Sequence, residues 1–158
     1  MIKIFAEFHG GKRCPNISYR LNNANLIPGT IETIDRTSVL RKMIISLPCE
    51  FQQGQNHLTL IQQDKTDDDL IFNTDGMIDH YVDVKEIEID GIRLESVLYQ
   101  AQPTFEHSMP DTWVEMMTQQ GFDIPKIYYN TTQLRLNGEW HLVFESPVWR
   151  WRSQKLLS

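Results

Sequence analysis

Residues 133–145 read QLRLNGEWHLVFE, and this stretch decides the predicted fold. Apolar residues alternate with polar ones on both sides of Asn137-Gly138, which is the period of a half-buried strand. Asn-Gly is the pair that best fits a two-residue type I′ turn. The stretch therefore predicts a β-hairpin made of residues 133–136 and 139–145.

Other short apolar runs recur along the chain, with turn residues between them. The predicted strands are residues 2–8, 17–21, 39–47, 57–62, 81–90 and 92–99. Between residues 84 and 87 the apolar alternation slips by one position, which predicts a β-bulge. Seven or more strands without a helix after each of them favour an all-β, two-sheet antiparallel β-sandwich, jelly-roll-like, over a parallel α/β sheet.

One stretch has helical spacing instead. Pro110 suits a first turn, and Trp113 and Met117 repeat at helical intervals, so we expect one short α-helix there. No repeat or linker divides the chain. We expect one sandwich domain over residues 1–148 and a C-terminal arm of residues 149–158 that becomes ordered on assembly.

Composition and charge exclude several classes of partner. The 158 residues carry 15 Lys and Arg against 21 Asp and Glu, a net charge of −6, which argues against binding a nucleic-acid backbone. No apolar run approaches the length of a membrane span, and the first residues, MIKIFAEF, lack a secretory signal. We expect no membrane partner, no export, and reduced thiols at Cys14 and Cys49.

The motifs of common enzyme classes are absent from the sequence. The five histidines are scattered, and no two of them have the close spacing of a paired metal site. We interpret them, His57 and His141 included, as structural residues, and we predict a protein without catalytic residues.

An acidic segment at residues 64–80 is rich in Asp and Asn, whose oxygens are the ligands that Ca²⁺ prefers. One interpretation is a calcium site built from Asp67, Asp69, Asn73 and Asp75. The other is a solvated loop whose charge keeps sheet edges apart. We expect no other cofactor.

Trp149-Arg150-Trp151-Arg152 alternates with the period of a strand, which would place both indoles on one face and both guanidinium groups on the other. Such indoles can belong to the core or anchor a subunit interface. Together with Tyr81 they can also form a platform on which sugar rings stack. We favour core or interface over the glycan platform.

Several stretches together resemble small β-sandwich structural proteins of tailed bacteriophages. They are VLRK at residues 39–42, GQNHLTL at 54–60, KTD at 65–67, IEIDGI at 87–92, NGEW at 137–140 and FESPVW at 144–149. The resemblance covers residues 39–151 and implies a virion component, made in the host cytoplasm and present in many copies on a capsid, neck, tail or fibre. Similar strand-turn-strand patterns occur in carbohydrate-binding modules.

The leading hypothesis is therefore a non-enzymatic structural protein of a phage virion that self-associates or docks to other virion proteins. Trp149 and Trp151 would anchor the interface, and Arg150 and Arg152 would pair with carboxylates of a neighbour. The alternative is a calcium-assisted carbohydrate-binding module that stacks sugars on Trp149, Trp151 and Tyr81. Neither hypothesis involves nucleic acid or a membrane.

Overall fold

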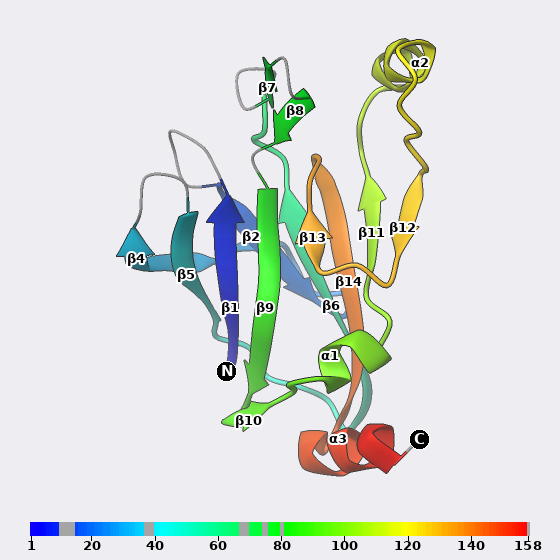
Figure 1. Cartoon of the computed structure of the whole chain (residues 1–158). Helices are drawn as coiled ribbons and strands as arrows, with labels where there is room; N and C mark the ends of the chain where they lie inside the picture. The colour runs from blue at the N-terminus through cyan, green and yellow to red at the C-terminus, as the bar shows by residue number, and fades with distance from the viewer. Residues whose placement is uncertain (10–14, 37–39, 67–69, 74–75, 80, 158) are drawn as a thin grey trace.

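The computed structural model consists of two antiparallel sheets packed face to face, with three short helices in the part of the chain that it describes (Figure 1). It describes every residue except 10–14, 37–39, 67–69, 74–75, 80 and 158. The two-sheet, all-β sandwich that the sequence predicts is confirmed.

Sheet A has β1 at its centre. Its strand order is β10-β9-β1-β5-β4, and β13 pairs with the first residues of β9. The strands are β1 Ile2–His9, β4 Thr30–Arg36, β5 Leu40–Leu47, β9 Tyr81–Ile89, β10 Ile92–Arg93 and β13 Gln133–Leu134. Opposite Phe5 and Ala6, β9 contains one extra residue, Lys85, so the bulge predicted between residues 84 and 87 is confirmed.

Sheet B has the order β12-β11-β14-β6-β2-β3. Its strands are β2 Ile17–Leu21, β3 Ile27–Pro28, β6 Gly54–Gln62, β11 Thr104–His107, β12 Ile127–Tyr129 and β14 Gly138–Ser146. The acidic segment contains a separate two-stranded ladder of β7, Leu70–Asn73, and β8, Gly76–Asp79. The helices are α1 Val97–Gln100, α2 Asp111–Gln119 and α3 Val148–Leu157.

The core lies between the two sheets. Ile4 and Val84 of sheet A and Trp140, Leu142 and Phe144 of sheet B all belong to it and are fully buried. The Trp140 indole Nε1 donates a hydrogen bond to the Thr131 carbonyl oxygen at 2.8 Å, so its polar atom is satisfied inside the apolar layer.

The predicted hairpin of residues 133–136 and 139–145 is wrong. β13 pairs with β9 in sheet A, whereas β14 pairs with β6 and β11 in sheet B, so Asn137-Gly138 carries the chain from one sheet to the other. The Asn137 side chain exchanges hydrogen bonds with the Lys65 backbone instead of stabilising a turn. Gly138 has φ of 155°, and a Cβ there would overlap the Glu106 carbonyl oxygen. The glycine is therefore needed where the start of β14 approaches the backbone of β11 closely.

Residues 92–99 also differ from the prediction. Glu95 adopts φ of 52°, which ends the extended run soon after β10, and the chain continues into α1.

The predicted helix is present as α2, and α1 and α3 occur in addition to it. The strands that were not predicted are β3, β4, β7, β8, β11 and β12. None of the described helices is long and apolar enough to cross a lipid bilayer.

Candidate functional site

Residues 149–152 lie on a helix, so the strand period inferred for them is wrong. They belong to α3, at the lower end of the sandwich in Figure 1. Residues two positions apart on an α-helix point about 200° apart. Trp149 is accordingly 62% exposed, whereas Trp151 is 6% exposed and belongs to the hydrophobic core. The two indoles do not share one surface.

Helix α3 is fixed to the sandwich. The ring of Trp151 lies edge-on to that of Phe144 on β14, with centroids 6.5 Å apart. Nη2 of Arg152 lies 2.9 Å from Oε2 of Glu95, so this guanidinium pairs within its own chain. Because Trp151 contributes to the core, residues 149–157 are not separated from the domain that we expected to end at residue 148.

Some apolar side chains of α3 are nevertheless exposed. Trp149 and Leu156 are seven positions apart and so lie on one face of the helix. Leu156 is 46% and Leu157 is 89% exposed. We call Trp149, Leu156 and Leu157 the α3 patch. Arg150, next to Trp149 in the chain, is also exposed. Exposed apolar side chains grouped on one helix can form part of a contact surface.

Tyr81 lies far from this patch. It is the first residue of β9, and α1 and α3 lie beyond the other end of that strand (Figure 1). Eight residue steps of a strand span about 26 Å. The guanidinium carbon of Arg135 lies 3.9 Å from the Tyr81 ring centroid and so covers one of its faces. The predicted sugar platform of Tyr81, Trp149 and Trp151 is therefore not formed.

The predicted calcium ligands fall largely outside the described residues. Asp67, Asp69 and Asp75 are among the residues that the structure does not describe, and Asn73 is placed only by its backbone position in β7. Elsewhere, the described part of the chain contains no group of three or more His, Cys, Asp or Glu arranged to hold a metal ion. The calcium site stays a prediction.

Two histidines that the sequence analysis treated as scattered meet on the outer face of sheet B. Nε2 of His57 on β6 lies 2.8 Å from Nδ1 of His141 on β14. Nε2 of His141 lies 3.4 Å from Oε2 of Glu139, which favours a proton on that nitrogen. Nδ1 of His141 is then the acceptor, and His57 Nε2–H is the donor. Burial lowers the pKa of His57, and the neighbouring His141 and Arg20 lower it further.

This cluster has part of the layout of a hydrolase site. The Thr59 hydroxyl lies 3.3 Å from His141 Nδ1, and Glu139 contacts the other ring nitrogen. The imidazole therefore lies between a hydroxyl and a carboxylate, as in a catalytic triad. However, Thr59 is only 2% exposed, and the same Nδ1 already contacts His57. A substrate carbonyl cannot reach the hydroxyl, so the cluster in this form is suited to holding strands together.

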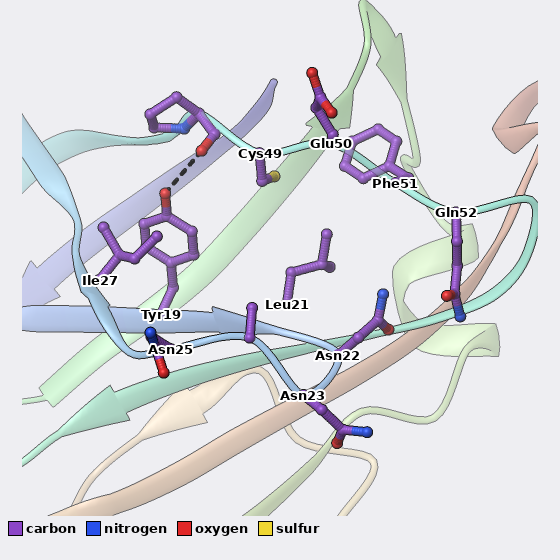
Figure 2. Close-up of a pocket in the computed structure, with 12 residues that line it drawn as sticks. Tyr19, Leu21, Asn22, Asn23, Asn25, Ile27, Cys49, Glu50, Phe51 and Gln52 are labelled. Carbon is purple, nitrogen blue, oxygen red and sulfur yellow. Dashed lines mark hydrogen bonds between the residues drawn. The ribbon is translucent and has the colours of Figure 1, made fainter.

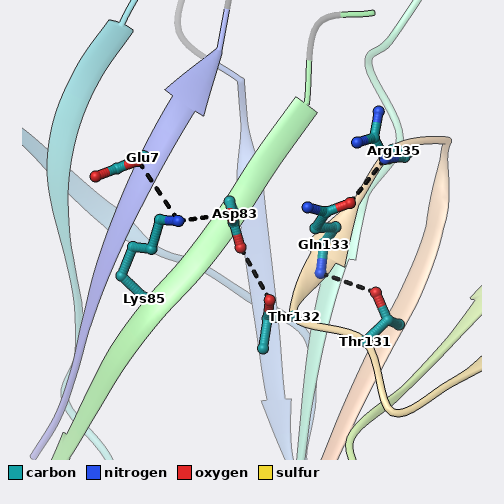
Figure 3. A network of polar contacts seen from close by, with 7 residues as sticks. All are labelled: Glu7, Asp83, Lys85, Thr131, Thr132, Gln133 and Arg135. Atoms are coloured by element: carbon teal, nitrogen blue, oxygen red, sulfur yellow. Dashed lines mark hydrogen bonds and ion pairs between the residues drawn. The ribbon is translucent and has the colours of Figure 1, made fainter.

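A second polar network explains why β13 joins sheet A (Figure 3). Asp83 of β9 is buried, and its Oδ1 accepts a hydrogen bond from the Thr132 hydroxyl at 2.9 Å. Nζ of Lys85 lies 2.9 Å from Oδ2 of Asp83 and 3.7 Å from Oε2 of Glu7 on β1. The hydrogen bond to Asp83 raises the pKa of Lys85. This lysine is therefore a charged structural partner and not a nucleophile.

A groove of about 680 Å³ opens at the edge of the sandwich (Figure 2). One side is the Asn-rich loop of residues 22–25, which connects β2 to β3. The other side is the segment of residues 48–52, which leads from β5 to β6. Tyr19, Leu21 and Ile27 lie between them (Figure 2). The groove brings together segments about 25 residues apart in the sequence, as sheet pairing dictates.

The buried amide of Asn56 and the Tyr19 hydroxyl hold both sides of the groove in place. The fully buried Asn56 accepts hydrogen bonds from Asn22 Nδ2 at 3.2 Å and from the Gln52 backbone N–H at 3.1 Å. It donates to the Gln52 carbonyl oxygen at 2.8 Å. The Tyr19 hydroxyl donates to the Pro48 carbonyl oxygen at 2.9 Å (Figure 2). Hydrogen bonds within the chain therefore fix the positions of both sides of the groove.

Sequence reasoning missed both the groove and the histidine cluster. In the sequence, the asparagines of residues 22–25 look like an ordinary polar connection, and no local signal links them to residues 48–52. That His57 and His141 belong to two predicted strands was visible, but not that these strands are neighbours.

No protein family, no curated protein and no solved structure matches this chain in comparisons with known proteins.

Proposed function

We propose that this protein is a non-enzymatic structural component of a tailed-phage virion that acts by assembling with further copies of itself. The observation that carries the proposal is the α3 patch. Trp149 projects from a helix that Trp151 fixes to the core, so this exposed indole is held on a rigid support. Tryptophan is enriched among the residues that dominate interface energies, and a rigid support reduces the entropy lost on binding.

The sequence supports the virion part of the proposal through its resemblance to small β-sandwich proteins of tailed phages over residues 39–151. Multi-copy virion proteins need a contact surface, and the exposed apolar side chains of the α3 patch support this assignment. The calcium-assisted carbohydrate-binding alternative has less support in its original form. Of its three aromatic residues, Trp151 is buried, and Tyr81 lies at the opposite end of β9 from α3.

The test is size-exclusion chromatography with light scattering over a range of protein concentrations. We expect the wild type to form a discrete oligomer and Trp149→Ala to weaken its association by about thirtyfold or more, as at other interface hot spots. Met116→Ala is the matched control, because Met116 is 46% exposed on α2 and lies outside the patch. A wild-type chain that stays monomeric throughout, or a Trp149→Ala variant that assembles normally, would refute the proposal.

A further inference from the structure

The mouth of the groove carries amide side chains that have no hydrogen-bond partner among the described residues. Asn23 and Asn25 are exposed, and neither side chain makes a hydrogen bond within the described residues. Each amide offers two N–H donors and a carbonyl acceptor. These two residues can therefore exchange hydrogen bonds with a ligand without breaking any that stabilise the fold.

The walls beside these amides are apolar. Ile27 is 44% exposed, and Phe51 is half-buried (Figure 2). The Phe51 ring lies 5.5 Å from that of Phe144 in an edge-on arrangement. Leu21 lies deeper, between the two sides. Apolar walls with a few placed polar groups are typical of sites for small organic ligands.

The charge of the groove limits the chemistry of such a ligand. Among the described residues that line it, Glu50 is the single charged side chain, and no Lys or Arg is present. An anion such as a phosphate or sulfate would meet no positive partner in a chain of net charge −6. A divalent cation would find one carboxylate, which is fewer than it needs. The lining therefore suits an uncharged molecule that both donates and accepts hydrogen bonds.

We propose that this groove binds a short stretch of an uncharged polysaccharide. The hydroxyl groups of the sugar exchange hydrogen bonds with Asn23 and Asn25, and its C–H faces pack on Ile27 and Phe51. Because the network around Asn56 already fixes the groove, binding orders few additional side chains. The proposal is independent of assembly through the α3 patch, and it needs neither calcium nor the three aromatic residues considered earlier.

The test uses the full chain and two readouts. Saturation-transfer NMR measures binding of the neutral hexasaccharides of glucose, xylose and mannose, with a galacturonic acid hexamer as the anionic comparison. Cys49 lines the groove, so its alkylation rate, followed by mass spectrometry, reports occupancy. Burial raises the pKa of the Cys49 thiol, so alkylation is run in mildly alkaline buffer.

We expect at least one neutral hexasaccharide to bind and to slow alkylation of Cys49. Asn23→Ala combined with Asn25→Ala should weaken this binding by about tenfold or more. The matched control is Gln119→Ala combined with Gln120→Ala, which removes two exposed amides at the end of α2. Chelation of calcium should leave hexasaccharide binding and the alkylation rate of Cys49 unchanged. The variant with both Asn23→Ala and Asn25→Ala should assemble as the wild type does.

Four results would overturn the proposal. They are no binding of any neutral hexasaccharide, binding that survives loss of both asparagines, binding that chelation abolishes, and protection of Cys49 by a pool of neutral octapeptides but not by sugars. The last result would assign the groove to an extended peptide.

Discussion

Replacing Trp151 with alanine should strongly destabilise the fold, although this residue lies in the last turns of the chain. Its indole is 6% exposed and contacts Phe144 in the core. An aromatic side chain of this size buries about 200 Å², of which an alanine would retain about 50 Å². The remaining 150 Å² corresponds to about 4 kcal/mol at roughly 25 cal/mol per Å². This agrees with the about 3–5 kcal/mol measured for tryptophan-to-alanine changes in cores.

Thermal and urea unfolding, followed by circular dichroism at a concentration where the chain is monomeric, measure the effect. For a domain of this size, a loss of about 4 kcal/mol should lower Tm by about 8–16 °C. Trp149→Ala is the matched control, because its indole is 62% exposed, and we expect its free energy of unfolding to change by about 0.5 kcal/mol or less. If Trp151→Ala unfolds within about 1 kcal/mol of the wild type, α3 does not pack on the sandwich.

Three further predictions concern the polar clusters and one glycine. Thr132→Ala should lower the free energy of unfolding by about 1–3 kcal/mol, because it leaves the buried Asp83 short of a donor, and an unchanged urea midpoint would contradict this. The pKa of His57 is lowered in the native state, so the unfolded chain binds more protons in acid. The contribution of His57 to the free energy of unfolding should be fully present above about pH 6.5 and should be lost as pH drops through the native pKa. His57→Gln should reduce this pH dependence of the free energy of unfolding in urea titrations. Gly138→Ala should cost more than about 1 kcal/mol in thermal unfolding and more than Gly91→Ala, which has open space around it; equal losses would argue against the close approach of β11 to Gly138.

Local sequence signals predicted the features whose causes are local. The slip of apolar alternation between residues 84 and 87 identified the bulge, because an extra residue changes the side-chain phase within one strand. The start and apolar spacing of α2 were likewise visible. The partners of the two strands that flank Asn137-Gly138 were not visible. The sequence cannot tell whether two such strands pair with each other or with distant strands.

The candidate functional surfaces could not be predicted either, because they also follow from which elements are neighbours in the fold. Four residues, Trp149 to Arg152, are too few to distinguish a strand period from a short helix, so the positions of the two indoles were misassigned. His57 and His141 meet only because β6 and β14 are neighbours in register. The groove joins two connections whose contact follows from the sheet order, and the amide of Asn56 between them gave no local signal.

The central position of β1 constrains when this protein can fold during synthesis. β1 is made before the other described strands, yet its partners are residues 40–47 and 81–89, and β14 fills the middle of sheet B only after residue 138 has been made. At ribosomal rates of about 5–20 residues per second, β1 waits on the order of ten seconds before both sheets are complete. Apolar strands are exposed meanwhile, so a nascent chain of this protein should depend on chaperones more than its small size suggests.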